Sequence, residues 1–130
     1  GFAFADRQWY LVQGARPAVP GKPPAGGLVP VESQVRIVLP LMAREPLRLS
    51  LSGELRGQGA AVRATFNGTP IPLRLRPAGG AVALDQLDLE VPESVVHSRG
   101  WLNELVFDNL AEGSQLKRLD LSPVKDWWRR

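Results

Sequence analysis

The sequence contains no cysteine and only one histidine, His97, among its 130 residues. The lack of cysteine excludes disulfides and thiolate metal sites, and a single histidine cannot form the histidine cluster of a zinc enzyme. No apolar run reaches the ~18 residues that predict a transmembrane helix. We therefore expect no metal and no cofactor. We interpret His97 as a surface or capping residue in a turn.

Patterns that bring reactive groups together are also missing. No serine lies in a Gly-x-Ser-x-Gly turn. Gly53, Gly57 and Gly59 lead into a predicted strand rather than a helix, so we expect a hairpin loop and not a phosphate site. Asp88 and Glu90 would share one strand face, but the sequence places no second acid across a groove from them. The sequence predicts no catalytic residue and a protein that is not an enzyme.

Charge and length limit which partners the protein can bind and how many domains it can contain. Sixteen Lys and Arg residues against thirteen Asp and Glu residues give a net charge of +3, and the basic residues are scattered rather than clustered. This distribution argues against nucleic acid as a partner, which would require a basic stripe. With 130 residues and 44% hydrophobic content, the chain suits one domain spanning residues 1–130.

Short alternating runs, punctuated by twelve prolines and thirteen glycines, are what the sequence offers instead. Alternation of apolar and polar residues predicts strands with one buried and one solvated face. About eight strands are expected, near Gln8–Gln13, Gln34–Leu39, Leu47–Ser52, Val62–Phe66, Ile71–Arg76, Val82–Val91, Leu102–Phe107 and Leu116–Leu121. Unequal loops favour a two-sheet antiparallel sandwich, jelly-roll-like and with little helix, over a closed barrel.

Turn chemistry marks the connections. Asn67-Gly68 predicts a two-residue type I′ turn, because both central positions need positive φ. Pro70 and Pro72 lack backbone donors, so the strand that follows should lie at a sheet edge. The Pro/Gly-rich segment at 16–30 is expected to be an extended surface loop. The segment Glu93–Ser98, opened by a proline, is expected to form one short turn.

Four segments of the sequence resemble a known family. The segment Val62–Ile71 resembles the strand, Asn-Gly, strand hairpin of galactose-binding-domain-like jelly rolls. Further on, Leu87–Pro92 and Gly100–Phe107 resemble the later strands of the same domains, in the same order. The segment before Trp9 is similar to the start of such modules on bacterial cell-surface or polysaccharide-related proteins.

The resemblance implies a non-catalytic accessory domain that binds carbohydrate on an extracytoplasmic or envelope protein. The alternative is a structural or protein-interaction sandwich without a small-molecule ligand, because fold alone does not give function. Family members often carry a structural calcium. Here Asp85, Asp88 and Glu90 lie in the corresponding region without a recognisable loop pattern, so we predict no metal.

Aromatic rings stack on sugar faces while polar groups bind the hydroxyls, and a row of arginines suits a carboxylated or phosphorylated glycan. The candidate ligand-binding residues are therefore Trp9, Tyr10, Arg63, Arg74, Arg76 and Trp101. The alternatives are that Trp101 packs over the end of the sandwich and that the arginines form a solubilising face. Asn103 is expected to tie its loop by side-chain to backbone bonds.

Near the end of the sequence, Trp127 and Trp128 precede two arginines. Paired tryptophans beside cations are typical of a membrane interface, so these residues predict proximity to a membrane. Alternatively, they cover the edge of the sandwich. The expected partners are a glycan and other domains of a longer parent protein.

Overall fold

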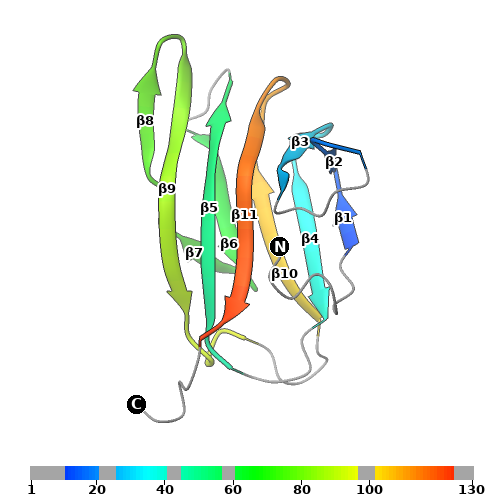
Figure 1. The fold of residues 1–130 in the computed structure, drawn as a ribbon, viewed down its shortest axis with the longest axis vertical. Helices are drawn as coiled ribbons and strands as arrows, with labels where there is room; N and C mark the ends of the chain where they lie inside the picture. The colour runs from blue at the N-terminus through cyan, green and yellow to red at the C-terminus, as the bar shows by residue number, and fades with distance from the viewer. Residues whose placement is uncertain (1–10, 21–25, 41–44, 57–60, 97–101, 125–130) are drawn as a thin grey trace.

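In the computed structural model, the described residues are 11–20, 26–40, 45–56, 61–96 and 102–124, and they form two antiparallel sheets packed face to face (Figure 1). The five-stranded sheet contains, in spatial order, β1 (Leu11–Gln13), β4 (Val35–Pro40), β10 (Leu102–Asp108), β6 (Arg63–Phe66) and β7 (Thr69–Ile71). The six-stranded sheet contains β2 (Ala15–Pro17), β3 (Leu28–Pro30), β11 (Gln115–Pro123), β5 (Leu47–Leu55), β9 (Ala81–Val91) and β8 (Leu75–Ala78). The described residues contain no α-helix. The predicted two-sheet sandwich is confirmed.

The core lies between the sheets, where the predicted alternation places it. In β5, Leu47, Leu49 and Leu51 are fully buried while Arg48 between them is exposed. Facing strands supply the other large core side chains, among them Leu39, Phe66, Leu105 and Phe107. Burying one such side chain contributes about 1.5–3 kcal/mol, so the apolar faces are what hold the two layers together.

The Asn67-Gly68 turn is confirmed. Both residues have positive φ, 49° and 80°, and the flanking residues Phe66 and Thr69 pair across the hairpin. As the position of Pro70 predicted, β7 is the terminal strand of its sheet. The predicted turn after Pro92 is also present in its described part, residues 92–96.

The strand predicted after this turn is wrong in extent. It ends at Ile71, and Leu75 begins β8 in the opposite sheet. Between them, Pro72 has no N–H to continue the ladder, and residues 72–74 carry the chain across the sandwich. The alternating pattern runs through this segment unchanged because both Ile71 and Leu75 face the same core from opposite sides.

The loop expected at 16–30 is also wrong in part. Within it, β2 and β3 pair, with Arg16 opposite Val29, and the N–H of Ala18 donates to the carbonyl of Gly27 at 2.9 Å. Leu28 is buried, so an apolar anchor holds a segment that its prolines and glycines had assigned to a surface loop. Gly53 was assigned to a hairpin loop but lies inside β5, next to register shifts with both neighbouring strands.

The chain also crosses between the sheets at Gly14, which separates β1 from β2. Gly14 has a φ of +82°, and a Cβ placed on it would lie 2.1 Å from the backbone oxygen of Gln34. Only glycine fits this crossing without displacing the backbone. The two crossings, at Gly14 and at residues 72–74, join the terminal strands of the two sheets on opposite sides of the sandwich.

Three of the four terminal strands contain a proline: Pro17 in β2, Pro70 in β7 and Pro77 in β8. Hydrogen-bonded and non-hydrogen-bonded pairs alternate along an antiparallel ladder. Each of Pro70 and Pro77 lies in the residue pair next to the one that closes a two-residue turn. This next pair is a non-hydrogen-bonded one, so the backbone nitrogens of both prolines point to the free edge of the sheet. Proline offers no donor there, which protects the edge against pairing with another chain.

Candidate functional site

The sequence-predicted ligand-binding residues do not form one surface in the part of the chain that the structure describes. Trp9, Tyr10 and Trp101 lie outside the described residues, as do His97, Trp127 and Trp128. Arg63 is exposed on β6 of the five-stranded sheet, opposite Asp108. Arg74 and Arg76 lie beside and on β8 at the edge of the six-stranded sheet.

Arg76 is engaged with an acid of the neighbouring strand. Its Nε and terminal nitrogen each lie 3.1 Å from a carboxylate oxygen of Asp85. The hydrogen bond from Arg76 lowers the pKa of Asp85 against the opposing effect of burial, and the charges of Arg76 and Arg74 lower it further. A glycan carboxylate at this edge would therefore have to compete with Asp85.

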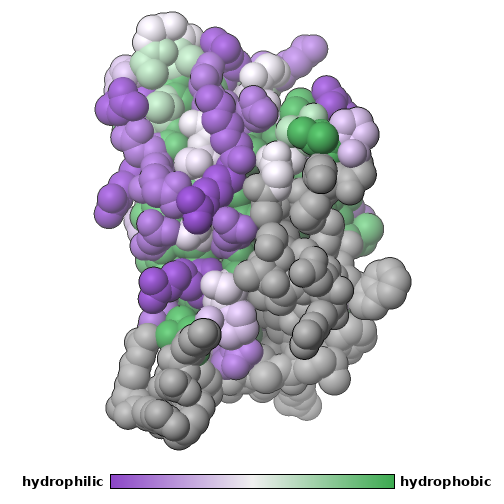
Figure 2. Space-filling view, viewed as in Figure 1, coloured by the Kyte–Doolittle hydropathy of each residue, from purple (hydrophilic) through white to green (hydrophobic). Residues whose placement is uncertain are grey.

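Strands β5, β9 and β11 present an outer face that is largely hydrophilic (Figure 2). Ser50 donates to Asp88, and this hydrogen bond lowers the pKa of Asp88 despite the opposing effect of burial. Within β11, Arg118 contacts Asp120 at 3.1 Å. Opposite charges alternate across this face, which makes it a solvated surface with little net field.

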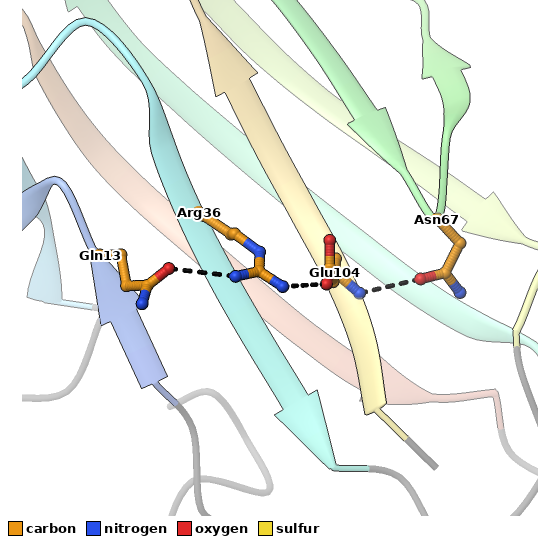
Figure 3. Close-up of polar contacts among 4 residues, drawn as sticks. All are labelled: Gln13, Arg36, Asn67 and Glu104. Carbon is orange, nitrogen blue, oxygen red and sulfur yellow. Dashed lines mark hydrogen bonds and ion pairs between the residues drawn. The ribbon is translucent and has the colours of Figure 1, made fainter. Parts of the chain in front are cut away.

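A row of polar contacts crosses the five-stranded sheet (Figure 3). Arg36 donates to the Oε1 atom of Gln13 at 3.2 Å and to the carboxylate of Glu104. The N–H of Glu104 in turn donates to the Oδ1 atom of Asn67 at 2.8 Å. The hydrogen bond from Arg36 lowers the pKa of Glu104 more than burial raises it, so Glu104 stays ionised and suits an ion pair better than proton donation.

The row ends on a part-buried amide pair. Asn67 donates from Nδ2 to the Oδ1 atom of Asn103 and to the carbonyl of Val95, each at 2.8 Å. Asn103 is completely buried and lies within β10. Its strand position agrees with the strand expected at Leu102–Phe107. Its side chain accepts from the Asn67 side chain of a hairpin far away in sequence, a contact that the sequence did not predict.

A concave hollow of 680 Å³ is lined in part by the connection between β10 and β11. Figure 1 shows this connection at the upper end of the sandwich. Three segments far apart in sequence line it: Arg16 on β2, residues 29–33, and residues 110–113. The N–H groups of Val31 and Glu32 both donate to the carbonyl of Gly14, at 2.8 and 3.1 Å, and fix the second segment. The N–H of Leu110 donates to the carbonyl of Ser33 at 2.8 Å and ties the second segment to the third.

The lining combines charge with apolar surface. Arg16, Glu32 and Glu112 contribute one guanidinium and two carboxylates, and Val31, which is 62% exposed, adds an apolar contact. A second hollow of 420 Å³ shares Ser33, Leu110 and Ala111 with the first, so the concave surface continues towards Asn109. We call the surface formed by the residues of both hollows the end pocket.

Sequence patterns did not indicate the three charged residues of the end pocket, because Glu32 and Glu112 lie in connections between strands and Arg16 lies on a three-residue strand inside the predicted loop. The only available signal was the turn-forming composition around them, such as Glu112-Gly113.

Comparison with known proteins adds no assignment. No family model, curated protein or solved structure matches the chain. Among the described residues, no three acidic, histidine or cysteine side chains gather to hold a metal ion. The described part of the chain also has no helix with the length and apolar character needed to cross a membrane.

Proposed function

We propose that this chain is a non-catalytic binding module that takes a carbohydrate in the end pocket. The supporting observation is the main hollow of this pocket, which has a volume of 680 Å³ and is lined by a guanidinium, two carboxylates and an exposed aliphatic side chain. Ligand pockets typically measure about 300–1,000 Å³ and carry a few polar groups that fix orientation. Carboxylates accept hydrogen bonds from sugar hydroxyls, and a guanidinium donates hydrogen bonds to the hydroxyl oxygens. Val31 can contact the C–H face of the sugar ring.

The position of the pocket agrees with this proposal. Its charged groups extend from turns and a strand end that the two packed sheets hold in place, which is the usual arrangement of binding residues on a rigid scaffold. By contrast, the outer face of the six-stranded sheet already satisfies its charges internally, through contacts such as Arg118 with Asp120.

A titration followed by amide NMR tests the proposal. Neutral and acidic oligosaccharides are added to isotope-labelled protein up to millimolar concentration, and we expect shifts confined to residues 29–33 and 109–113. The variants Arg16→Ala and Glu112→Gln should weaken binding, while the matched control Arg118→Ala should leave it unchanged. Binding absent at millimolar concentration, or shifts confined to another surface, would contradict the proposal.

A second candidate function, a protein-interaction sandwich without a small ligand, is favoured by a different surface. Leu11 and Leu102, on the outer face of the five-stranded sheet, are 53% and 49% exposed. Both lie next to β4, opposite Val38 and Pro40. Exposed apolar side chains close together are typical of interaction surfaces. If Leu102→Ser alters association with a neighbouring domain of the parent protein and no oligosaccharide binds, this second function replaces the first.

The resemblance to galactose-binding-like modules also motivates a proposal about location. We place the module on an extracytoplasmic or envelope protein, beside other domains and with residues 127–128 near a membrane. The sequence of the full parent protein tests this placement. A signal peptide or membrane span in that sequence would support it, and a parent with neither would contradict it.

A further inference from the structure

The Asn67-Gly68 turn combines a reactive sequence with a restrained side chain. In an Asn-Gly pair, the glycine backbone nitrogen can attack the asparagine Cγ, because glycine has no Cβ to obstruct the approach. A bond then forms between Gly68 N and Asn67 Cγ, the bond from Cγ to Nδ2 breaks, and ammonia leaves. Water opens the resulting succinimide to aspartate or isoaspartate.

The fold holds Asn67 away from this reaction. Its Oδ1 atom accepts from the N–H of Glu104, and its Nδ2 donates to Val95 and Asn103, all at 2.8 Å. Its own backbone N–H donates to the carbonyl of Glu104 at 2.8 Å. Cyclisation requires the amide to rotate towards Gly68 and to leave these partners, one of which is fully buried.

The product would not restore the same contacts. An aspartate at 67 has no side-chain N–H for the carbonyl of Val95, and instead places a negative charge against that acceptor. Isoaspartate adds a methylene to the backbone inside a two-residue turn whose flanking residues, Phe66 and Thr69, are in register. Either product destabilises the hairpin through an unpaired polar group or a strained turn.

We infer that Asn67 is a deamidation site gated by the fold: the closed hairpin protects it, and reaction in the opened chain produces a form that refolds less stably. Local opening then sets the rate, because only the open fraction of molecules can react. This property is independent of any ligand in the end pocket.

Peptide mapping by mass spectrometry tests the inference on the full chain. Folded and urea-unfolded samples are incubated at mildly alkaline pH, and residue 67 is followed over time. We expect deamidation in the folded sample to be slower by about tenfold or more, since tenfold corresponds to only about 1.4 kcal/mol of opening free energy. Asn109 is an internal control: it also has positive φ, 64°, but Leu110 follows it, so it should stay intact in both samples.

Two outcomes would overturn the inference. One is equal deamidation at residue 67 in the folded and unfolded samples, or none in either. The other concerns the product: Asn67→Asp, which reproduces the aspartate form, should unfold at lower urea concentration than the native chain, and an unchanged midpoint would show that the modification has no structural effect.

Discussion

The Nδ2 atom of Asn67 lies 2.8 Å from the Oδ1 atom of Asn103, and this contact joins the tip of a hairpin to a strand that is 36 residues later in sequence. Asn103 is fully buried. Buried polar groups of this kind are stable only when they are paired. The contact therefore adds a side-chain tie to the backbone ladder that already pairs β6 with β10.

Removing one partner tests the importance of this pair. Asn103→Ala leaves one N–H of Asn67 without its acceptor, and we expect a loss of about 1–3 kcal/mol in the free energy of unfolding. Urea titration measures this as a lower midpoint with an unchanged slope. Gln86→Ala, on an exposed position, is the control and should change stability by less than about 0.5 kcal/mol. Equal stability of the two variants would show that the amide pair is dispensable.

Stability should depend on the ionisation of Glu104. Arg36 holds the pKa of Glu104 below the usual 4.5 of a glutamate. A lowered carboxyl pKa means that the stabilising contribution is present above pH 4.5 and is lost as the pH falls through the lower, folded-state pKa. Urea midpoints measured from neutral to acidic pH should therefore decline less steeply for Glu104→Gln. In an Arg36→Gln background the same change should have little effect on the profile, and an undiminished effect would assign the pH dependence to other groups.

The edge prolines should keep the protein from associating through its strands. Pro77→Thr supplies an N–H at the free edge of β8, where proline has none. We expect concentration-dependent self-association of this variant in analytical ultracentrifugation, under conditions in which the native chain sediments as a smaller species. Pro92→Thr removes a proline outside the strands and should behave like the native chain. An unassociated Pro77→Thr variant would argue that β8 is protected by something other than its proline.

Gly14 and Gly68 form a matched pair that separates the energetic cost of a positive φ from the cost of a backbone clash. Both have φ near +80°, but a Cβ on Gly14 would lie 2.1 Å from the oxygen of Gln34, whereas one on Gly68 meets nothing within 4 Å. Gly68→Ala should cost only the conformational strain, about 1–2 kcal/mol. Gly14→Ala adds a backbone clash, so its urea midpoint should be clearly lower than that of Gly68→Ala. Similar midpoints would mean that the chain relaxes around residue 14.

The sequence predicted the parts of the fold that depend on local pattern. Leu47, Leu49 and Leu51 face the core because a strand repeats every two residues, and Asn67-Gly68 turns because those residues tolerate positive φ. Pattern could not assign a strand to a sheet. Ile71 and Leu75 belong to one alternating run but to different layers, since both inner faces of a sandwich bury the same kind of residue.

The candidate site was less accessible to such reasoning. Arg16, Glu32 and Glu112 line one hollow only because strand β2 and two connections converge at one end of the sandwich, and no periodicity describes loop conformation. The pairing of Asn103 with Asn67 is a contact between two side chains distant in sequence, which strand patterning does not reveal. Of the predicted arginines, Arg63 and Arg76 lie on different sheets, and strand alternation carries no information about that separation.

The two crossings that join terminal strands of the sheets, out of the several places where the chain passes between the layers, have a mechanical consequence. On one side of the sandwich a single residue, Gly14, joins the layers, and on the other side residues 72–74 do so. The two sheets therefore cannot separate along either side while their terminal strands stay paired, because a short connection joins the sheets on each side. A terminal strand must first peel from its sheet, and amide protons throughout the core should consequently exchange with solvent together, as one cooperative unit.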